Sequence, residues 1–335
     1  MLHYRDLPII KTVTASHDYV LAEIGYPIVR HPYNYFIDEV LDVKADPTKS
    51  FYRKHWPDDP VSDERVKMCQ AKACEQDGHA GQEPIDVMVN DIGQFVILDG
   101  NHRACIQLRF RGGMITMNVR YVSPSWKRLS NYIDSIRDAS GKIYQRIEHP
   151  YFADIPYHYD DSRAKDVLDS IHASKPANNF IYEIGCNTGM FSRHFASRGY
   201  FPFGFDIASD NIMAAEMLAR AGRLRGYYFH ESDVLTMLKN HNTDNIGAVT
   251  CISVIHHYAR KGDMVTFKEY IREAARVGTV AYFDSETEYD NRRDYYKNGS
   301  FPDEQFMEKT FVELGLKYSK VSTGPIGRTI YMVKK

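Results

Sequence analysis

The segment that most constrains the fold of this chain is 178–206, NNFIYEIGCNTGMFSRHFASRGYFPFGFD. An apolar strand, 180–184, runs into the turn EIGCNTG, a helical pattern follows, and a second apolar strand ends on Asp206. Glycines in such a turn let the backbone bend sharply and approach a ligand closely. An acidic side chain about 20 residues further on is placed to accept hydrogen bonds from a ribose. The segment therefore predicts a βαβ unit that binds a nucleoside-type ligand.

The turn has the spacing Glu-x-Gly-x-x-x-Gly and lacks the third glycine expected of a pyrophosphate binder. It resembles motif I of class I S-adenosylmethionine (SAM) methyltransferases, whose ligand has a ribose and an adenine but no phosphate. The alternative is an ordinary βα turn in another Rossmann-like domain. The resemblance implies SAM as the cofactor, and it implies a cofactor site made of Glu183, Gly185, Cys186, Asn187, Gly189, Asp206, Ile207, Asp233, Val234 and Ser253.

Two acids carry most of this expected site. Asp206 closes the second strand, and its carboxylate would accept hydrogen bonds from both ribose hydroxyls. Asp233 follows the third strand, where the family places an acid against the adenine amino group. Each acid alone is equally well explained as a helix N-cap. Their positions at the ends of consecutive strands favour the ligand interpretation.

Residues 178–335 alternate strands and helices, a pattern typical of an α/β domain. The predicted strands are 180–184, 201–205, 226–230, 247–253, 278–283, 316–322 and 328–333. The predicted helices are 189–198, 210–222, 262–276 and 303–314. Together with the resemblance, this order predicts a class I SAM methyltransferase domain built on a Rossmann-like seven-stranded sheet.

The fourth predicted strand opens into a segment that contains Ser253, His256 and His257. Ligands bind at this end of open α/β sheets. Many methyltransferases of small molecules and glycans have a similar Ser-x-x-His-His segment, whereas DNA amino-methyltransferases carry an Asn/Asp-Pro-Pro-Tyr/Phe tetrapeptide that this sequence lacks. The resemblance implies methylation of an oxygen, whose proton a histidine can take near neutral pH. We predict that one histidine packs structurally and that the other is the catalytic base, with His256 ranked slightly above His257.

Three further side chains are expected to contact the substrate. Asp284 and Glu286 follow the fifth strand at the ligand end, where a solvated loop is an equal alternative. Arg328 ends a Gly-x-x-x-Arg segment similar to one in glycan-modifying relatives, where the arginine approaches an anionic acceptor. An exposed charge on an edge strand explains Arg328 equally well.

A second motif, VILDGNHR, lies at 96–103. A predicted hairpin of strands 84–90 and 95–98 contains its beginning, and a helix over 104–111 and a strand over 115–122 follow. The motif resembles the phosphate-binding turn of the ParB/sulfiredoxin superfamily, in which helix amides, Arg and His hold nucleotide phosphates. The resemblance implies ATP or CTP with Mg²⁺, phosphate contacts from Gly100, Asn101, His102 and Arg103, and catalytic roles for Asp99, His102 and Arg103.

The predicted organisation has three parts: a small α+β ParB/sulfiredoxin-like domain over 1–122, a helical connector over 123–177, and the methyltransferase domain over 178–335. Asn101 departs from the ParB pattern, which has a basic residue there, and no helix-turn-helix module follows it. Binding of DNA is therefore a weak alternative, and a degenerate domain kept for packing is another. Glu23, Asp38 and Glu39 are the acids considered as helpers of phosphoryl transfer, with solvated surface acids as the simpler explanation.

Composition narrows the classes of partner. A net charge of −2 gives no basic field to recruit nucleic acid. No apolar run approaches the ~20 residues needed to cross a bilayer, and the start of the chain lacks the core of a signal peptide, so we expect a cytoplasmic protein. The five cysteines do not form zinc-type pairs, so free thiols and no metal site are predicted.

Three functions follow from these features. The first is a bifunctional enzyme that handles a phosphate in its N-terminal domain, as a kinase would, and methylates a small-molecule, glycan or phosphate acceptor in its C-terminal domain. The second is a methyltransferase whose N-terminal domain only recognises the acceptor. The third is a ParB-like protein associated with nucleic acid that carries a methylase, which the net charge disfavours.

Overall fold

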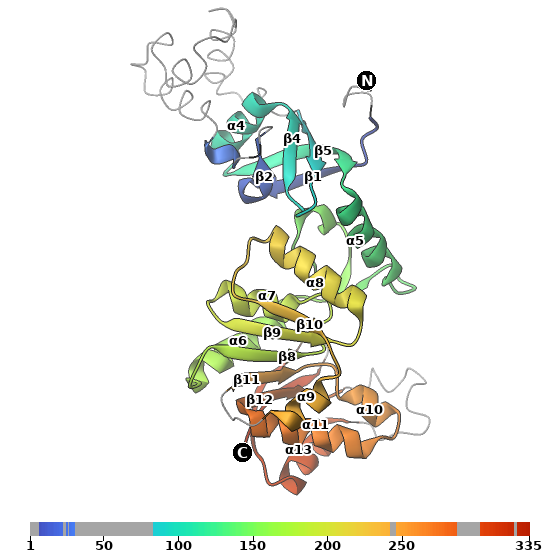
Figure 1. Cartoon of the computed structure of the whole chain (residues 1–335), viewed down its shortest axis with the longest axis vertical. Coiled ribbons are helices and arrows are strands. Elements are labelled where there is room, and N and C mark those ends of the chain that lie inside the picture. The colour runs from blue at the N-terminus through green and yellow to red at the C-terminus, as the bar shows by residue number, and fades with distance from the viewer. Residues whose placement is uncertain are drawn as a thin grey trace, which may run out of the picture. The chain divides into compact units, whose positions relative to one another are not determined.

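A computed structural model describes residues 7–22, 25, 27–30, 83–241, 246–286, 302–324 and 327–335. Glu23, Asp38 and Glu39, the three acids considered as helpers of phosphoryl transfer, lie outside these residues. So does the segment 61–75, whose charged amphipathic pattern predicts a helix. The chain forms two compact units, one of residues 1–131 with 148–154 and one of residues 132–147 with 155–335 (Figure 1). The segment predicted as a connector, 123–177, is therefore divided between the two units.

The N-terminal unit contains a five-stranded sheet in the order β1-β5-β3-β4-β2. Its strands are β1 (Lys11–Ser16), β2 (Val20–Leu21), β3 (Ile85–Val89), β4 (Phe95–Asp99) and β5 (Met114–Val122), and helix α4 (Asn101–Phe110) joins β4 to β5. Strands β3 and β4 form the predicted antiparallel hairpin, and β3 pairs with β5 in parallel. The helix begins three residues earlier than predicted, directly after Gly100, whose φ of 100° turns the chain out of the strand. The ParB/sulfiredoxin assignment of this unit stays a prediction.

The segment predicted as a helical connector, whose periodicity predicts one helix over 126–147, is helical only in the first half of that range. Helix α5 (Pro124–Ser135) is followed by a turn in which the Asp138 carboxylate accepts hydrogen bonds from the backbone N–H groups of Ser140 and Lys142, at 2.8 and 3.1 Å. Such side-chain bonds to nearby N–H groups compete with helix formation. The chain then enters β6 (Ile143–Gln145), which pairs in parallel with β7 (Tyr157–Tyr159).

The periodicity of the connector also predicts a helix over 162–174, which is confirmed as α6 (Ser162–Ser174) and belongs to the C-terminal unit. Its apolar residues Val167 and Ile171 are buried in one core with Phe195 and Tyr282. The helix therefore covers the sheet that follows it in sequence.

The C-terminal unit contains a seven-stranded sheet in the order β10-β9-β8-β11-β12-β14-β13, and the predicted sheet is confirmed. Its strands are β8 (Phe180–Ile184), β9 (Phe201–Asp206), β10 (Tyr228–Glu231), β11 (Ile246–Cys251), β12 (Gly278–Asp284), β13 (Lys317–Thr323) and β14 (Thr329–Lys334). All pairings are parallel except those of β14, which is antiparallel to both its neighbours. The predicted strand boundaries agree within two residues.

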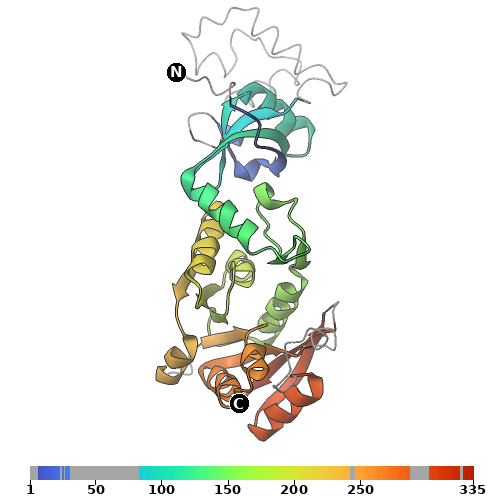
Figure 2. The ribbon, with the colours of Figure 1, turned by 90° about the vertical axis from the view of Figure 1, so that its right-hand side faces the viewer.

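Helices cover both faces of this sheet (Figures 1 and 2). They are α7 (Met190–Ser197), α8 (Ser209–Ala221), α9 (Val234–Asn240), α10 (His256–Arg260), α11 (Met264–Val277) and α13 (Glu304–Glu313). Alternate residues of one strand reach opposite cores: Val280 and Tyr282 pack with α6 and α7, whereas Ala281 and Phe283 pack with α9, α11 and α13. This burial on both faces is typical of parallel sheets and explains the apolar strand sequences.

Candidate functional site

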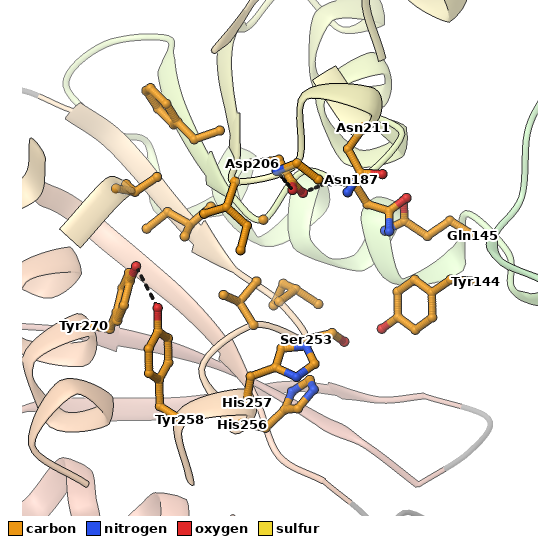
Figure 3. Close-up of a pocket in the computed structure, with 18 of the residues that line it drawn as sticks. Tyr144, Gln145, Asn187, Asp206, Asn211, Ser253, His256, His257, Tyr258 and Tyr270 are labelled. Atoms are coloured by element: carbon orange, nitrogen blue, oxygen red, sulfur yellow. Dashed lines mark hydrogen bonds between the residues drawn. The ribbon is translucent and has the colours of Figure 1, made fainter. Parts of the chain in front are cut away.

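A cavity of about 770 Å³ opens in the C-terminal unit, at the carboxyl ends of β8, β9 and β11. Its polar lining separates into two ends in Figure 3. Asn187, Asp206 and Asn211 lie at one end, and Ser253, His256 and His257 lie at the other. Ligands bind at this place in open α/β sheets because the strand order reverses there.

The turn after β8 approaches the cavity as the sequence predicts. Gly185 and Asn187 both line the cavity and have positive φ angles of 69° and 51°. A Cβ atom added to Gly185 would lie 2.3 Å from Val254 Cγ2, so only glycine fits between the turn and the β11 loop. This close approach of backbone to the cavity is what a ligand cradle requires.

Asp206 occupies the predicted position at the end of β9. Its carboxylate accepts hydrogen bonds from Asn187 N–H at 2.9 Å and from Ala208 N–H at 3.0 Å, one on each oxygen. Each carboxylate oxygen can accept a further bond, so the group can still receive a pair of hydroxyls from the cavity. Ile207, which follows it, lines the cavity with its side chain exposed.

Four predicted cofactor residues do not line the cavity, and each is explained by local packing. Glu183 is buried and accepts hydrogen bonds from the backbone N–H and hydroxyl of Ser192, so it anchors the first turn of α7. Burial raises the pKa of Glu183 to about 7, although these bonds oppose the rise. Cys186 has a free, buried thiol, and Gly189 packs where a Cβ would come within 2.9 Å of Ala215 and Phe229.

Asp233 is the fourth of these residues, and its position matches the alternative explanation by helix capping. The carboxylate accepts hydrogen bonds from Leu235 N–H and from the hydroxyl of Tyr270, both at 3.2 Å, and thereby caps α9. Its neighbours Ser232 and Val234 line the cavity instead. An N-cap and an adenine-binding acid have the same spacing after a strand, so the sequence could not separate them.

Both predicted histidines line the cavity. Their ring centroids lie 4.3 Å apart, and His256 is buried whereas His257 is exposed. Burial lowers the pKa of His256 well below its usual value, and the neighbouring charges of His257, Arg260 and Arg328 add to this shift. Burial and nearby cations also lower the pKa of His257. Both rings are therefore neutral near pH 7, as a proton acceptor must be.

The three predicted substrate residues, Asp284, Glu286 and Arg328, are buried in one cluster of charges, and of the three Arg328 lines the cavity. Asp284 accepts hydrogen bonds from Arg163 at 2.5 Å and from Ser253 N–H at 2.6 Å, and Arg328 lies 3.5 Å from it. Burial raises the pKa of Asp284, but these cations and the N–H group outweigh it and hold the pKa below the usual value. The acid therefore stays ionised and fixes Ser253, whose φ is 61°.

Glu286 extends this cluster toward the histidines. Its carboxylate contacts Arg260, and its Oε1 lies 3.5 Å from Arg328 and 3.7 Å from His256 Nε2. Asp284 and Glu286 are each 2% exposed, so the alternative of a solvated loop is wrong for both. Arg328 is 3% exposed and lines the cavity, so the alternative of an exposed edge charge is wrong as well.

The second predicted site, in the N-terminal unit, is arranged around Arg103. Its guanidinium donates to the Asp99 carboxylate at 3.2 Å, to Glu83 at 3.4 Å and to the Pro84 carbonyl at 3.3 Å. Gly100 caps α4, and Asn101 and His102 begin the helix, as the motif requires. The side chain of His102 lies outside the described residues. These ion pairs are the arrangement expected of a structural role, and phosphate binding at this turn stays a prediction.

Several cavity residues have no counterpart among the sequence-based predictions. Tyr144 and Gln145 come from β6, His158 comes from β7, and Arg260 and Lys261 come from the end of α10. Tyr159 of β7 is a connector tyrosine for which the sequence left open a place in a cleft or in a hinge, and it lines the cavity. Tyr159 stacks its ring 5.2 Å from the Arg163 guanidinium and 5.9 Å from that of Arg328. The sequence does not predict β6 and β7, because a strand of three residues is too short for the alternation of apolar and polar side chains to be recognised.

Comparisons with known proteins give one matching family model and several similar solved structures. A family model described as a methyltransferase domain matches residues 182–279. The structure of the bifunctional kinase-methyltransferase WbdD is similar with a TM-score of 0.50 and 18% identity, over 60% of this chain but only 46% of the WbdD chain. Magnesium protoporphyrin IX methyltransferase (ChlM) from Synechocystis PCC 6803 with bound SAM gives a TM-score of 0.40 at 17% identity, over 52% of this chain and 79% of that chain. No curated protein matches the chain in sequence.

The sheet order, the glycine turn at the cavity and the matched family together support a class I methyltransferase domain in the C-terminal unit. The family match also supports SAM as its cofactor. Among the described residues, no helix is long and apolar enough to cross a membrane.

Proposed function

We propose that this protein transfers the methyl group of SAM to an oxygen of a negatively charged acceptor, either a phosphate or a sugar or small molecule that bears an anionic group. The observation that carries this proposal is the lining of a single cavity. A carboxylate, Asp206, stands at one end, and the histidine pair stands with Arg260, Lys261 and Arg328 at the other.

The cofactor end fits SAM. The turn at Gly185 presents backbone to the cavity where a Cβ would collide with Val254, and Asp206 has acceptor capacity for two hydroxyls. In this proposal Asp206 binds the ribose, and Gly185, Asn187 and Val234 enclose the rest of the nucleoside. When bound, SAM supplies an activated methyl group on a sulfonium.

Three cationic side chains, Arg260, Lys261 and Arg328, line the acceptor end. Arg163 and Arg328 contact the carboxylate of Asp284, and Arg260 and Arg328 contact that of Glu286. Arginine guanidinium groups bind carboxylate and phosphate oxygens well. An anionic acceptor is therefore the kind of substrate that a wall with Arg260, Lys261 and Arg328 would bind.

The two histidines differ in how well each can act as a general base. A general base works best when its pKa lies near the operating pH. His256 is 5% exposed and its pKa lies well below the usual value, whereas His257 is exposed and its pKa is lowered less strongly. We therefore rank His257 above His256 as the base for a hydroxyl acceptor, and we assign His256 the structural role beside Glu286. A phosphate oxygen is already ionised at pH 7 and needs no base.

The test is an acceptor screen with methyl-labelled SAM, using sugar phosphates, acidic sugars and matched neutral sugars. Label should reach anionic acceptors and not the neutral ones, and Arg328→Gln should weaken acceptor binding without changing the affinity for S-adenosylhomocysteine (SAH). Equal labelling of neutral and anionic acceptors would remove the support for an anionic substrate. With a hydroxyl acceptor, His257→Ala should lose ~10²–10⁴-fold in rate, the usual contribution of a general base. With a phosphate acceptor the same variant should lose little.

A second activity in the N-terminal unit stays a prediction. The observation in its favour is the strand–glycine–helix turn at Asp99 to Arg103, and the ion pairs of Arg103 favour a structural role instead. ATP and CTP, each with Mg²⁺, should raise the thermal midpoint of the wild type and not that of Arg103→Ala if the turn binds a nucleotide. A wild type that neither nucleotide stabilises would leave acceptor recognition as the role of this unit.

A further inference from the structure

Two polar atoms in the cavity wall lack a hydrogen-bond partner among the described residues. They are the hydroxyl oxygen of Tyr144 and the side-chain oxygen of Gln145, both buried and both on β6. Both side chains line the cavity. Buried polar atoms in proteins nearly always have a partner, so two such atoms on one cavity wall suggest that a ligand supplies it.

The two side chains point to different ends of the cavity. In Figure 3 the Gln145 amide points toward Asn187 and Asn211, at the Asp206 end, whereas the Tyr144 hydroxyl points toward Ser253. The alternation of side chains along a strand accounts for this difference between neighbours. Gln145 thus faces the cofactor end, and Tyr144 faces the acceptor end.

Gln145 belongs to the segment 132–147 of the C-terminal unit, and this segment makes a second contact with the cofactor end through Tyr132. The Tyr132 hydroxyl, near the end of α5, donates a hydrogen bond to Asn211, which lines the cavity beside Asp206. Burial raises the pKa of Tyr132 to about 12, and the negative charges of Asp206 and Asp210 contribute to the rise. This segment therefore lies within electrostatic reach of the Asp206 carboxylate.

The backbone of β6 is also well held, so Gln145 is a fixed group. Ile143 N–H donates to the Pro156 carbonyl at 3.0 Å, and Arg146 N–H donates to the Tyr159 carbonyl at 2.9 Å. Gln145 itself is 9% exposed. A ligand group placed opposite its amide would meet an acceptor oxygen already in position.

We propose that Gln145 is a cofactor-contacting residue, whose side-chain oxygen accepts a hydrogen bond from a donor group of bound SAM or SAH. This inference rests on the proposed function, because it takes the Asp206 end as the cofactor end. It assigns part of the cofactor site to a strand that precedes the methyltransferase sheet in sequence. No motif of the sheet predicts that contact.

Calorimetry with SAH tests the contact directly, because the readout is binding and not activity. Gln145→Leu removes the acceptor oxygen at similar volume and should weaken SAH binding about tenfold, the effect of one lost hydrogen bond to a buried group. Gln145→Glu keeps an acceptor oxygen and should bind within about threefold of the wild type. Tyr144→Phe removes the neighbouring unpartnered hydroxyl, which faces the other end, and should leave the SAH affinity unchanged.

The outcomes separate this inference from the proposed function. A wild type that binds SAH together with a Gln145→Leu variant that binds equally well overturns the contact and leaves the methyltransferase proposal intact. Equal weakening of SAH binding by Gln145→Leu and Tyr144→Phe also overturns it, because the loss of affinity would then not be specific to Gln145. A wild type that shows no SAH binding overturns the proposed function itself.

Discussion

Replacement of Gly185 by alanine tests the geometry of the cofactor turn. Gly185 has a φ of 69°, and an added Cβ would lie 2.3 Å from Val254 Cγ2 but 3.5 Å from Val254 Cβ and 3.6 Å from Cγ1. Carbon atoms do not approach to 2.3 Å, so Gly185→Ala must displace the valine side chain or the turn. Both residues line the cavity, so either movement disturbs the cofactor end.

The expected loss of stability has two parts. A residue with a Cβ in the left-handed conformation costs ~1–2 kcal/mol. Overpacking of a close-packed site costs a further ~1–3 kcal/mol. Val254→Ala removes both γ carbons and leaves the valine Cβ at 3.5 Å, an ordinary contact. The double variant Gly185→Ala/Val254→Ala should therefore retain the backbone cost and lose the packing cost. The effects of the two changes on the free energy of unfolding should then couple favourably by ~1–3 kcal/mol.

Scanning calorimetry of the full chain measures this coupling, with SAH titration as the second readout. Gly199→Ala is the matched control, because Gly199 has a φ of 84° and nothing within 4 Å of an added Cβ. It should show only the backbone part, and Val254→Ala should not relieve it. Additive effects of Gly185→Ala and Val254→Ala, within about 0.5 kcal/mol, would refute the reasoning. Equal losses for the two glycine variants would refute it as well.

Two further predictions concern buried ionisable side chains, the Arg163–Asp284 ion pair and the His256 ring. Arg163→Met should lower the free energy of unfolding by ~3–5 kcal/mol, because Asp284 would stay buried without its closest cation. Lys268→Met, which removes a half-exposed pair with Glu313, should change it by less than ~1 kcal/mol, and equal losses in urea unfolding would contradict the assignment. The lowered pKa of His256 means that the unfolded chain takes up a proton below pH 6.5 that the folded chain resists, so stability should fall from pH 7 to pH 5. His256→Gln should flatten this dependence, and an unchanged slope would count against the buried neutral ring.

The sequence predicted the sheet well because each strand of the C-terminal unit ends in a recognisable change of pattern. The turn at 183–189 and the acid at Asp206 locate two strand ends, and the apolar runs locate the others. Helices α9 and α10 were missed, since seven and five residues are too few for a 3.6-residue period to be read. The strands β1 and β2 of the N-terminal unit also escaped prediction.

The site was predicted where it follows strand ends and missed where the fold brings distant segments together. Asp206, Ser253 and the histidine pair each follow a strand, and all of them line the cavity. Arg163 pairs with Asp284 across 121 positions of sequence, and nothing near Arg163 distinguishes it from an exposed helical arginine. The same holds for Gln145, whose importance depends on the placement of β6. Asp233 shows the opposite case, in which a local pattern suited two roles and the structure shows the helix cap.

The central claim is that this cavity is a SAM site whose ribose contact is Asp206. Titration calorimetry of wild-type protein and Asp206→Ala with SAH tests it most directly. We predict saturable binding by the wild type and at least ~10-fold weaker binding by the variant, because a charge-assisted hydrogen bond contributes ~1.5–3 kcal/mol. A wild type without measurable binding, or a variant that binds SAH as tightly as the wild type, would contradict the claim.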